Sequence, residues 1–231
     1  QAEDGIRDCL LSRGLGDVYK RQNIGNMKKI LVLTLITFVS AEPQYPADSL
    51  LTSENTTFLQ KLFIYPIAQW QRISYNSNAF NCQFYPSCSN YCSIAIKEKG
   101  AVIGSIIGVD RITRCNPSAL YYHQKIDGAY KDSDGRIIDN INPLSYQKNN
   151  KSELLAVSLS LIPGMGKIYA GRAYDGIYGV FNLFVSLQAY SAATKNKNKF
   201  IANVFGLSSV VLYASEIYGS WRAVKYYQPK K

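Results

Sequence analysis

The stretch NCQFYPSCSNYC, Asn81 to Cys92, places three cysteines within eleven positions around an aromatic-Pro-Ser turn. The chain has five cysteines in all, and the other two are Cys9 and Cys115. Cysteines at this density suit a metal site, a thiol redox site, a disulfide framework or the centre of a small helical fold. The flanking sequence has to decide between these interpretations.

The residues after this turn predict two helices joined at a glycine. Residues 87–99 predict the first, which Gly100 ends as a C′ glycine, and four residues share one of its faces: Cys88, Tyr91, Cys92 and Ala95. Residues 101–114 predict the second, in which Gly104 and Gly108 form a small-xxx-small pair that lets another helix approach closely. We expect this hairpin to return Cys115 toward the first cysteines.

One further pattern in the second helix concerns charge. Asp110 and Arg114 are four residues apart, which predicts a helical ion pair worth a few tenths of a kcal/mol. The sequence Cys115-Asn116-Pro117 then ends the helix.

The segment before the cysteines, residues 58–73, predicts an amphipathic helix. Its apolar residues recur at helical spacing, and Pro66 inside it removes one backbone hydrogen bond. A helix that lies flat on a membrane and a helix packed on the next domain both remain open. In the membrane interpretation, the residues at the interface are Phe58, Leu62, Phe63, Trp70, Lys61 and Arg72.

The N-terminal residues divide into three parts. Residues 1–26 show no apolar periodicity and are similar to a translated sequencing-adapter tail, so we expect an artefact or a disordered extension. Residues 27–41 have the form of a signal peptide, with Lys28 and Lys29 before a short apolar run. Residues 42–57 are polar and predict a linker.

The polar residues 118–150 predict a linker with a β-hairpin around Asp134-Gly135, a pair that favours a tight turn. Asp132, Asp134 and Asp139 lie close in sequence, but their spacing does not match a twelve-residue calcium loop. We therefore expect a solvated hairpin here.

Residues 151–231 predict a membrane domain. Two segments, 174–194 and 200–221, are long enough to span a bilayer, while the Pro-Gly break in 154–170 predicts a bent or interfacial helix. We expect two membrane spans rather than three. A net charge of +10, with lysines and arginines scattered among these segments, suits an anionic membrane surface better than nucleic acid.

Chemistry at the cysteines is disfavoured by their spacing. The pattern C-x5-C-x3-C-x22-C has no C-x2-C knuckle, and His123 is the one histidine of the chain. We therefore predict no catalytic residue, no cofactor and no metal. In a reducing compartment the cysteines would be buried small hydrophobes, and in an oxidising one Cys82 or Cys88 would pair with Cys115.

The stretch from Asn81 to Pro117 resembles the membrane protein insertion efficiency factor family, YidD. The chain departs from the family at Gln83, where the family has Arg, and at Cys92, where it has a small residue. Residues 161–179 resemble small bacterial membrane domains of two packed helices. The residues that match the family motif are Cys82, Phe84, Pro86, Ser87, Cys88, Ser89, Tyr91, Arg111, Arg114, Cys115, Asn116 and Pro117.

These observations predict a mainly α protein, with a small helical-hairpin domain at 58–117, an N-terminal amphipathic helix and C-terminal transmembrane helices. The resemblance implies an accessory factor in the insertion or maturation of membrane proteins at the inner membrane. Its partners would be the lipid bilayer, and the insertion machinery or nascent membrane proteins, which it would bind without catalysis. Two alternatives remain: an exported, membrane-anchored envelope protein with a disulfide staple, and a thiol redox or zinc protein.

Overall fold

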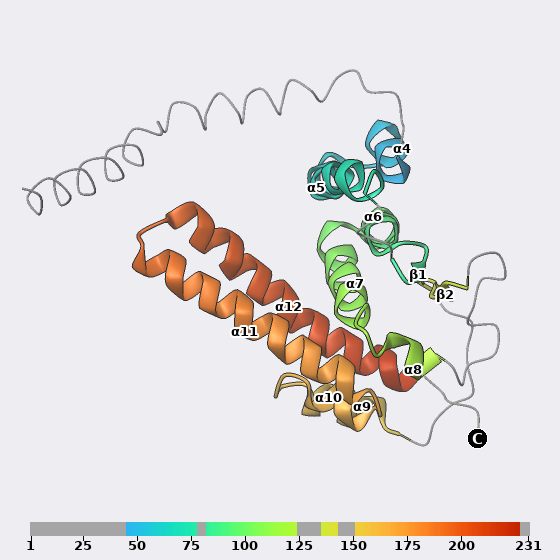
Figure 1. The fold of residues 1–231 in the computed structure, drawn as a ribbon, viewed down its shortest axis with the longest axis vertical. Coiled ribbons are helices and arrows are strands. Elements are labelled where there is room, and N and C mark those ends of the chain that lie inside the picture. Colours follow the sequence, from blue (N-terminus) through green and yellow to red (C-terminus); the bar gives the residue numbers. More distant parts are fainter. Residues whose placement is uncertain (1–44, 78–81, 124–134, 143–150, 227–231) are drawn as a thin grey trace, which may run out of the picture. The chain divides into compact units, whose positions relative to one another are not determined.

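A computed structural model of the chain describes residues 45–77, 82–123, 135–142 and 151–226. The regions expected to be an artefact (1–26) and a signal peptide (27–41) lie outside the described residues. From Tyr45 onward the chain forms one compact unit, and this unit is mainly helical, as predicted. In chain order (Figure 1) its elements are α4 (Pro46–Thr52), α5 (Phe58–Ser74), β1 (Phe84–Tyr85), α6 (Cys88–Lys99), α7 (Ala101–Arg114), α8 (Ala119–His123), β2 (Ile137–Ile138), α9 (Glu153–Leu159), α10 (Met165–Tyr169), α11 (Ala173–Lys195) and α12 (Lys199–Tyr226).

Helix α5 occupies the predicted amphipathic segment and starts at a capping box. The Thr57 backbone N–H donates to the side chain of Gln60, and the Gln60 N–H donates to the Thr57 hydroxyl, so two unpaired donors of the helix end are satisfied. The buried side of α5 packs Ile64 and Ala68 against Ile96 of α6. The opposite side leaves a row of apolar residues exposed to solvent.

The prediction of a linker over residues 42–57 was wrong for its central part, because residues 46–52 form helix α4. Pro46 suits the first helical position, and Ala47 joins the apolar cluster on α5. Gln71 of α5 is fully buried and accepts a hydrogen bond from the Ala47 N–H at 3.0 Å. The short helix forms because α5 offers it both an apolar surface and a buried polar partner.

The α6–α7 hairpin has the predicted boundaries. Ser87 caps α6 by accepting from the Asn90 N–H, and Gly100, with φ 86°, separates the two helices. The close approach expected from Gly104 and Gly108 is confirmed, because a Cβ on Gly108 would overlap the Sγ of Cys92. The sulfur of Cys92 therefore fills the space that the glycine leaves.

The first strand of the predicted β-hairpin around Asp134-Gly135 lies outside the described residues, so the hairpin stays a prediction. The strand β2 pairs in parallel with β1, with Phe84 opposite Ile137 and Tyr85 opposite Ile138. Phe84 and Ile137 are both buried and pack with Ala119 of α8. Burial of these apolar side chains holds β2 beside the cysteine turn, 53 positions away for each pair.

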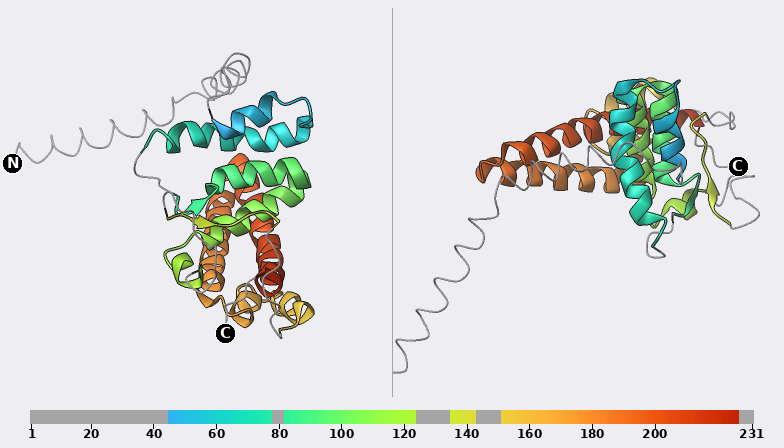
Figure 2. Two further views of the ribbon diagram at one scale, coloured as in Figure 1. Left: turned by 90° about the vertical axis from the view of Figure 1, so that its right-hand side faces the viewer. Right: turned by 90° about the horizontal axis from the view of Figure 1, so that it is seen from above.

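Two short helices, α9 and α10, replace the bent segment expected at 154–170, and Gly164 makes the break with a positive φ of 83°. Helices α11 and α12 run antiparallel beside each other (Figures 1 and 2). Among the described residues, α12 alone is long and apolar enough to cross a membrane. The predicted span at 174–194 is a helix, but glycines and polar residues such as Asn182 and Gln188 lower its hydropathy.

Gly108→Ala tests the close contact in the hairpin. The added methyl group would collide with Cys92, so we expect a loss of about 1–3 kcal/mol in the free energy of unfolding. Denaturant unfolding in detergent, followed by circular dichroism, measures it. The double variant Cys92→Ala/Gly108→Ala should recover part of the loss, whereas Val102→Ala, at an exposed position of α7, should change little. A stable Gly108→Ala protein would contradict the contact.

Candidate functional site

The cysteine turn, the start of α6 and the end of α7 bring three thiols together. The Sγ atoms of Cys82, Cys88 and Cys115 all lie within 4.8 Å of one another, and those of Cys82 and Cys88 are 3.4 Å apart. The predicted return of Cys115 is therefore confirmed. Cys92 lies apart from this cluster, buried on the hairpin, and the four described cysteines are free thiols.

Polar groups surround the three thiols. The backbone N–H of Cys88 donates to the Cys82 Sγ at 3.4 Å, and the Gln83 side chain donates to the Cys115 Sγ at 3.7 Å and to the Asn116 carbonyl at 2.9 Å. Hydrogen bonds from the thiols of Cys115 and Cys88 lower the pKa of Cys82 against the effect of burial. Burial raises the pKa of the separate Cys92 thiol to about 11.

A cavity of about 460 Å³ opens beside the thiols. Cys82, Cys88 and Ser87 line one side of it, and Trp70 and Tyr75 from the end of α5 line another. The cavity therefore joins the amphipathic helix to the cysteine turn.

Arg111 of α7 lies beneath the turn and contacts several residues of the family motif. Its guanidinium stacks on Phe84 at 4.0 Å and on Tyr91 at 4.6 Å, and donates to the Pro86 carbonyl at 2.9 Å. The side chain is fully buried. Arg111 thereby fixes the turn on the hairpin.

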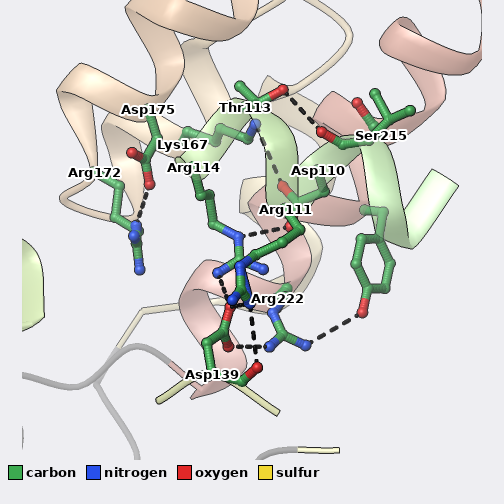
Figure 3. A network of polar contacts seen from close by, with 12 residues as sticks. Asp110, Arg111, Thr113, Arg114, Asp139, Lys167, Arg172, Asp175, Ser215 and Arg222 are labelled. Carbon is green, nitrogen blue, oxygen red and sulfur yellow. Dashed lines mark hydrogen bonds and ion pairs between the residues drawn. The ribbon is translucent and has the colours of Figure 1, made fainter. Parts of the chain in front are cut away.

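Asp139 is the centre of a buried charge network, and Figure 3 shows it with its arginine partners Arg111, Arg114 and Arg222. The network is defined here as nine side chains that are all less than 10% exposed: Asp110, Arg111, Arg114, Asp139, Lys167, Arg172, Asp175, Glu216 and Arg222. The carboxylate of Asp139 pairs with Arg111 at 2.8 Å, with Arg114 at 2.5 Å and with Arg222 of α12 at 2.7 Å. Arg222 also donates to the carbonyls of Asn140 and Ile141. The segment 135–142 is therefore clamped between α7 and α12.

A second branch of the buried charge network runs through Asp110. Arg114 donates to Asp110 at 2.8 Å, Lys167 of α10 lies 3.5 Å from it, and Lys167 pairs with Glu216 of α12 at 2.7 Å. Gly219 of α12 faces this branch, and a Cβ there would collide with the Asp110 carboxylate. The predicted helical pair of Asp110 and Arg114 is therefore confirmed, and the structure adds that it is buried and shared with Lys167.

The end of α7 is tied to α11 in the same way. The Asn116 amide donates to the Asp175 carboxylate at 2.7 Å, and Arg172 pairs with that same carboxylate. The Tyr122 hydroxyl accepts from the Tyr174 N–H at 2.8 Å. Through these contacts Asn116 of the family motif and Tyr122 of α8 hold the first turn of α11.

The structure separates the predicted interface residues into two groups. Phe58, Leu62 and Trp70 are exposed, at 83%, 56% and 47%. Phe63 instead packs on the α4–α5 cluster, and Arg72 pairs with Asp48 at 3.0 Å. Lys61 is half-buried.

Sequence analysis gave no buried role to six members of the buried charge network: Asp139, Lys167, Arg172, Asp175, Glu216 and Arg222. Asp139 was expected on a solvated hairpin, yet it is buried, because Ile137 and Ile138 carry it into the protein. One signal was available, since Glu216 and Arg222 are charged residues within a largely apolar helix.

The ionised form of Asp139 is strongly favoured. Burial alone would raise the pKa of this carboxyl group, but Arg114, Arg222 and Arg111 outweigh burial and hold the pKa well below its ordinary range. Asp110 shows the same balance, with Arg114 and Lys167 lowering its pKa against burial.

Asp139→Asn tests this centre. Removing one partner leaves three arginines without their shared carboxylate, so we expect a loss of about 3–5 kcal/mol in the free energy of unfolding. Because the pKa of Asp139 is lower in the folded state, its contribution is present above the ordinary Asp pKa of about 3.9 and fades as the pH falls further. Unfolding measured from about pH 8 to pH 3 should therefore show a constant difference that shrinks below about pH 4. Glu98→Gln, at an exposed site of α6, serves as the control, and an equal effect of the two variants would contradict the assignment.

Comparison with known proteins places the cysteine turn and hairpin in context. The YidD family model, described as "Putative membrane protein insertion efficiency factor", matches residues 59–125. A protein of that name from Protochlamydia amoebophila is 39% identical over 59 residues, which are 26% of this chain and 72% of the relative. One from Staphylococcus carnosus is also 39% identical over 59 residues, which are 26% of this chain and 70% of the relative.

A third relative of the same name, from Lactobacillus gasseri, is 53% identical over 36 residues, which are 16% of this chain and 37% of the relative. No solved structure matches the chain. The matched region contains the thiol cluster, Arg111 and Arg114, and it covers most of the length of the first two relatives. The chain therefore belongs to the YidD family of membrane protein insertion efficiency factors, with its helices α9 to α12 lying beyond the matched residues.

Proposed function

We propose that the chain is an accessory factor that binds nascent membrane proteins, or the machinery that inserts them, at the inner membrane, and that it acts without catalysis. The observation that carries this proposal is the placement of the family residues. Arg111, Arg114 and Asn116 point into the protein and hold its helices together, whereas apolar side chains face outward on α5 and on α11 and α12. Such a molecule offers surfaces for apolar partners.

The first of these surfaces is the α5 row, defined here as Phe58, Leu62, Trp70 and Ile73. These residues recur at helical spacing and are all exposed. A helix with this pattern suits the membrane interface, where Trp is favoured. We propose that the α5 row lies in lipid beside the cavity at the cysteine turn.

The second surface lies on the far halves of α11 and α12. Exposed apolar side chains gather there on both helices: Val180, Phe181, Phe184, Val185 and Leu187 on α11, and Phe200, Ile201, Val204, Leu207 and Val210 on α12. Lys195, Lys197 and Lys199 are exposed at the turn between the helices. An apolar pair with a basic tip suits insertion into a bilayer with anionic headgroups, so we propose that residues 151–231 form the membrane domain.

The buried charge network explains why the family unit at 58–117 and this membrane domain would act together. Asp110 and Lys167 join α7 to α10, and Arg222 brings α12 to the same carboxylate as Arg111. Charged groups at these positions are costly to separate once buried. A membrane domain that anchors in lipid would therefore hold the hairpin at the surface where nascent segments emerge.

Site-specific photocrosslinking tests the proposed binding. A photoreactive residue replaces Leu62 on the α5 row or Ile103 on exposed α7, in inverted inner-membrane vesicles, while a single-span membrane protein is synthesised in vitro. We expect adducts to the nascent chain from these apolar positions and few from Glu98, an exposed charged position on α6. The apolar segment of the client should be required, because apolar burial drives the contact.

A client whose membrane segment is replaced by polar residues provides the matched control. Equal crosslinking of the polar and the apolar client would contradict the proposal. So would labelling of Glu98→Cys by a membrane-impermeant maleimide in intact cells, because the hairpin would then face outward, as the exported alternative requires.

A further inference from the structure

The three clustered thiols have the arrangement of a metal site that keeps one position open. We propose that Cys82, Cys88 and Cys115 bind one thiophilic divalent ion, Zn²⁺, with the fourth position facing the adjacent cavity. Thiolates are the ligands that Zn²⁺ favours most among side chains, and sites with three protein ligands leave room for a water molecule or another ligand.

The sulfur separations fit this geometry. A tetrahedral Zn²⁺ with Zn–S bonds of about 2.3 Å places its sulfur ligands about 3.8 Å apart. In the structure, the Sγ atoms of Cys82 and Cys88 are 3.4 Å apart, and all three lie within 4.8 Å. Side-chain rotations alone can therefore bring the three sulfurs to metal-binding distance.

The surroundings offer N–H donors and a positive charge to the sulfur atoms. Backbone and amide N–H groups point at two of the sulfurs, from Cys88 to Cys82 and from Gln83 to Cys115. Cys88 is the first residue of α6, a helix of 12 residues, and the positive end of its dipole favours a thiolate. The fully buried Arg111 lies beneath the same turn, where it donates to the Pro86 carbonyl and adds a positive charge near the cluster.

The cavity makes the open position useful. It is about 460 Å³ in volume, and Cys82 and Cys88 share its wall with the hydroxyls of Ser87 and Ser89. A metal held by the three sulfurs would have its free side toward water and these hydroxyl groups. This layout differs from a closed structural site, in which a fourth protein ligand completes the tetrahedron.

The fold weakens the argument that the cysteine spacing disfavours a zinc site. The spacing C-x5-C-x3-C-x22-C lacks the C-x2-C knuckle of common zinc sites. The hairpin nevertheless brings Cys115, which is distant in sequence, close to Cys82 and Cys88 in space. Cys92, which made the spacing irregular, is not part of the cluster and is buried against Gly108. The metal site would stand whether or not the chain assists insertion.

Cobalt spectroscopy tests the site. The full chain carrying Cys9→Ser and Cys92→Ser retains only the three clustered cysteines, and it is purified in detergent, free of metal, with a phosphine reductant. We expect one equivalent of Co²⁺ to give an intense thiolate-to-cobalt charge-transfer band, and Zn²⁺ to abolish this band by displacement. Cys115→Ser in this background should remove most of the band, while circular dichroism reports that the helices persist.

Gln83→Ala provides a variant that leaves all three ligands in place. Loss of its N–H···S contact should weaken Zn²⁺ binding about tenfold in competition with a chromogenic chelator. A chain that binds no Co²⁺ under these conditions would overturn the proposal. So would a band of unchanged intensity in Cys115→Ser, or a Cys82–Cys88 disulfide that persists under the reductant.

Discussion

The interaction on which the rest of the structure depends is the sharing of one buried carboxylate, that of Asp139, by three arginines. Arg111 and Arg114 come from α7, and Arg222 comes from α12, so the pairing joins elements more than 100 positions apart in sequence. Taking these charges out of water is costly, and their mutual attraction offsets that cost only when the geometry is kept. The arrangement therefore specifies a single placement of α12 against α7.

The apolar clusters around this centre are small. The buried ion pairs therefore contribute much of what fixes the positions of the helices. One cluster consists of Tyr91, Ala95 and Ile107 in the hairpin, and another of Ala156, Ala170, Ala223 and Val224 below it. Many large apolar residues remain exposed, on α5 and on the far halves of α11 and α12. Membrane proteins show this combination of polar interior and apolar surface, because lipid rather than packing covers the apolar side chains. The membrane association of the family fits such a surface.

Local sequence signals predicted the elements well where one principle dominated. The helices at 58–73 and 87–99, the break at Gly100 and the close approach at Gly108 followed from the apolar pattern, backbone freedom and steric space, which act within a few residues. The thiol turn and the return of Cys115 also followed from the hairpin. These features could be predicted because their partners lie close in the sequence.

The errors arose where distant segments decide the environment. Residues 46–52 were predicted to be part of a polar linker, because their own sequence does not show that they pack on the apolar surface of α5. Asp139 was predicted to be solvated, because nothing in the sequence around Arg111 or Arg222 indicates that these arginines pair with it in the interior. A related limit applied to the metal question: the hairpin predicted that Cys115 returns toward the turn, but not that the Sγ atoms of Cys82, Cys88 and Cys115 all lie within 4.8 Å of one another. Only the three-dimensional arrangement reveals these relations.

Hydrogen exchange in lipid nanodiscs, comparing the native chain with Arg222→Met, tests the coupling most directly. If the shared carboxylate holds α7 and α12 as one unit, loss of Arg222 should raise the exchange of amides in both helices together, with α7 changing although the substitution lies on α12. Faster exchange confined to the last turns of α12, with α7 fully protected, would contradict the account.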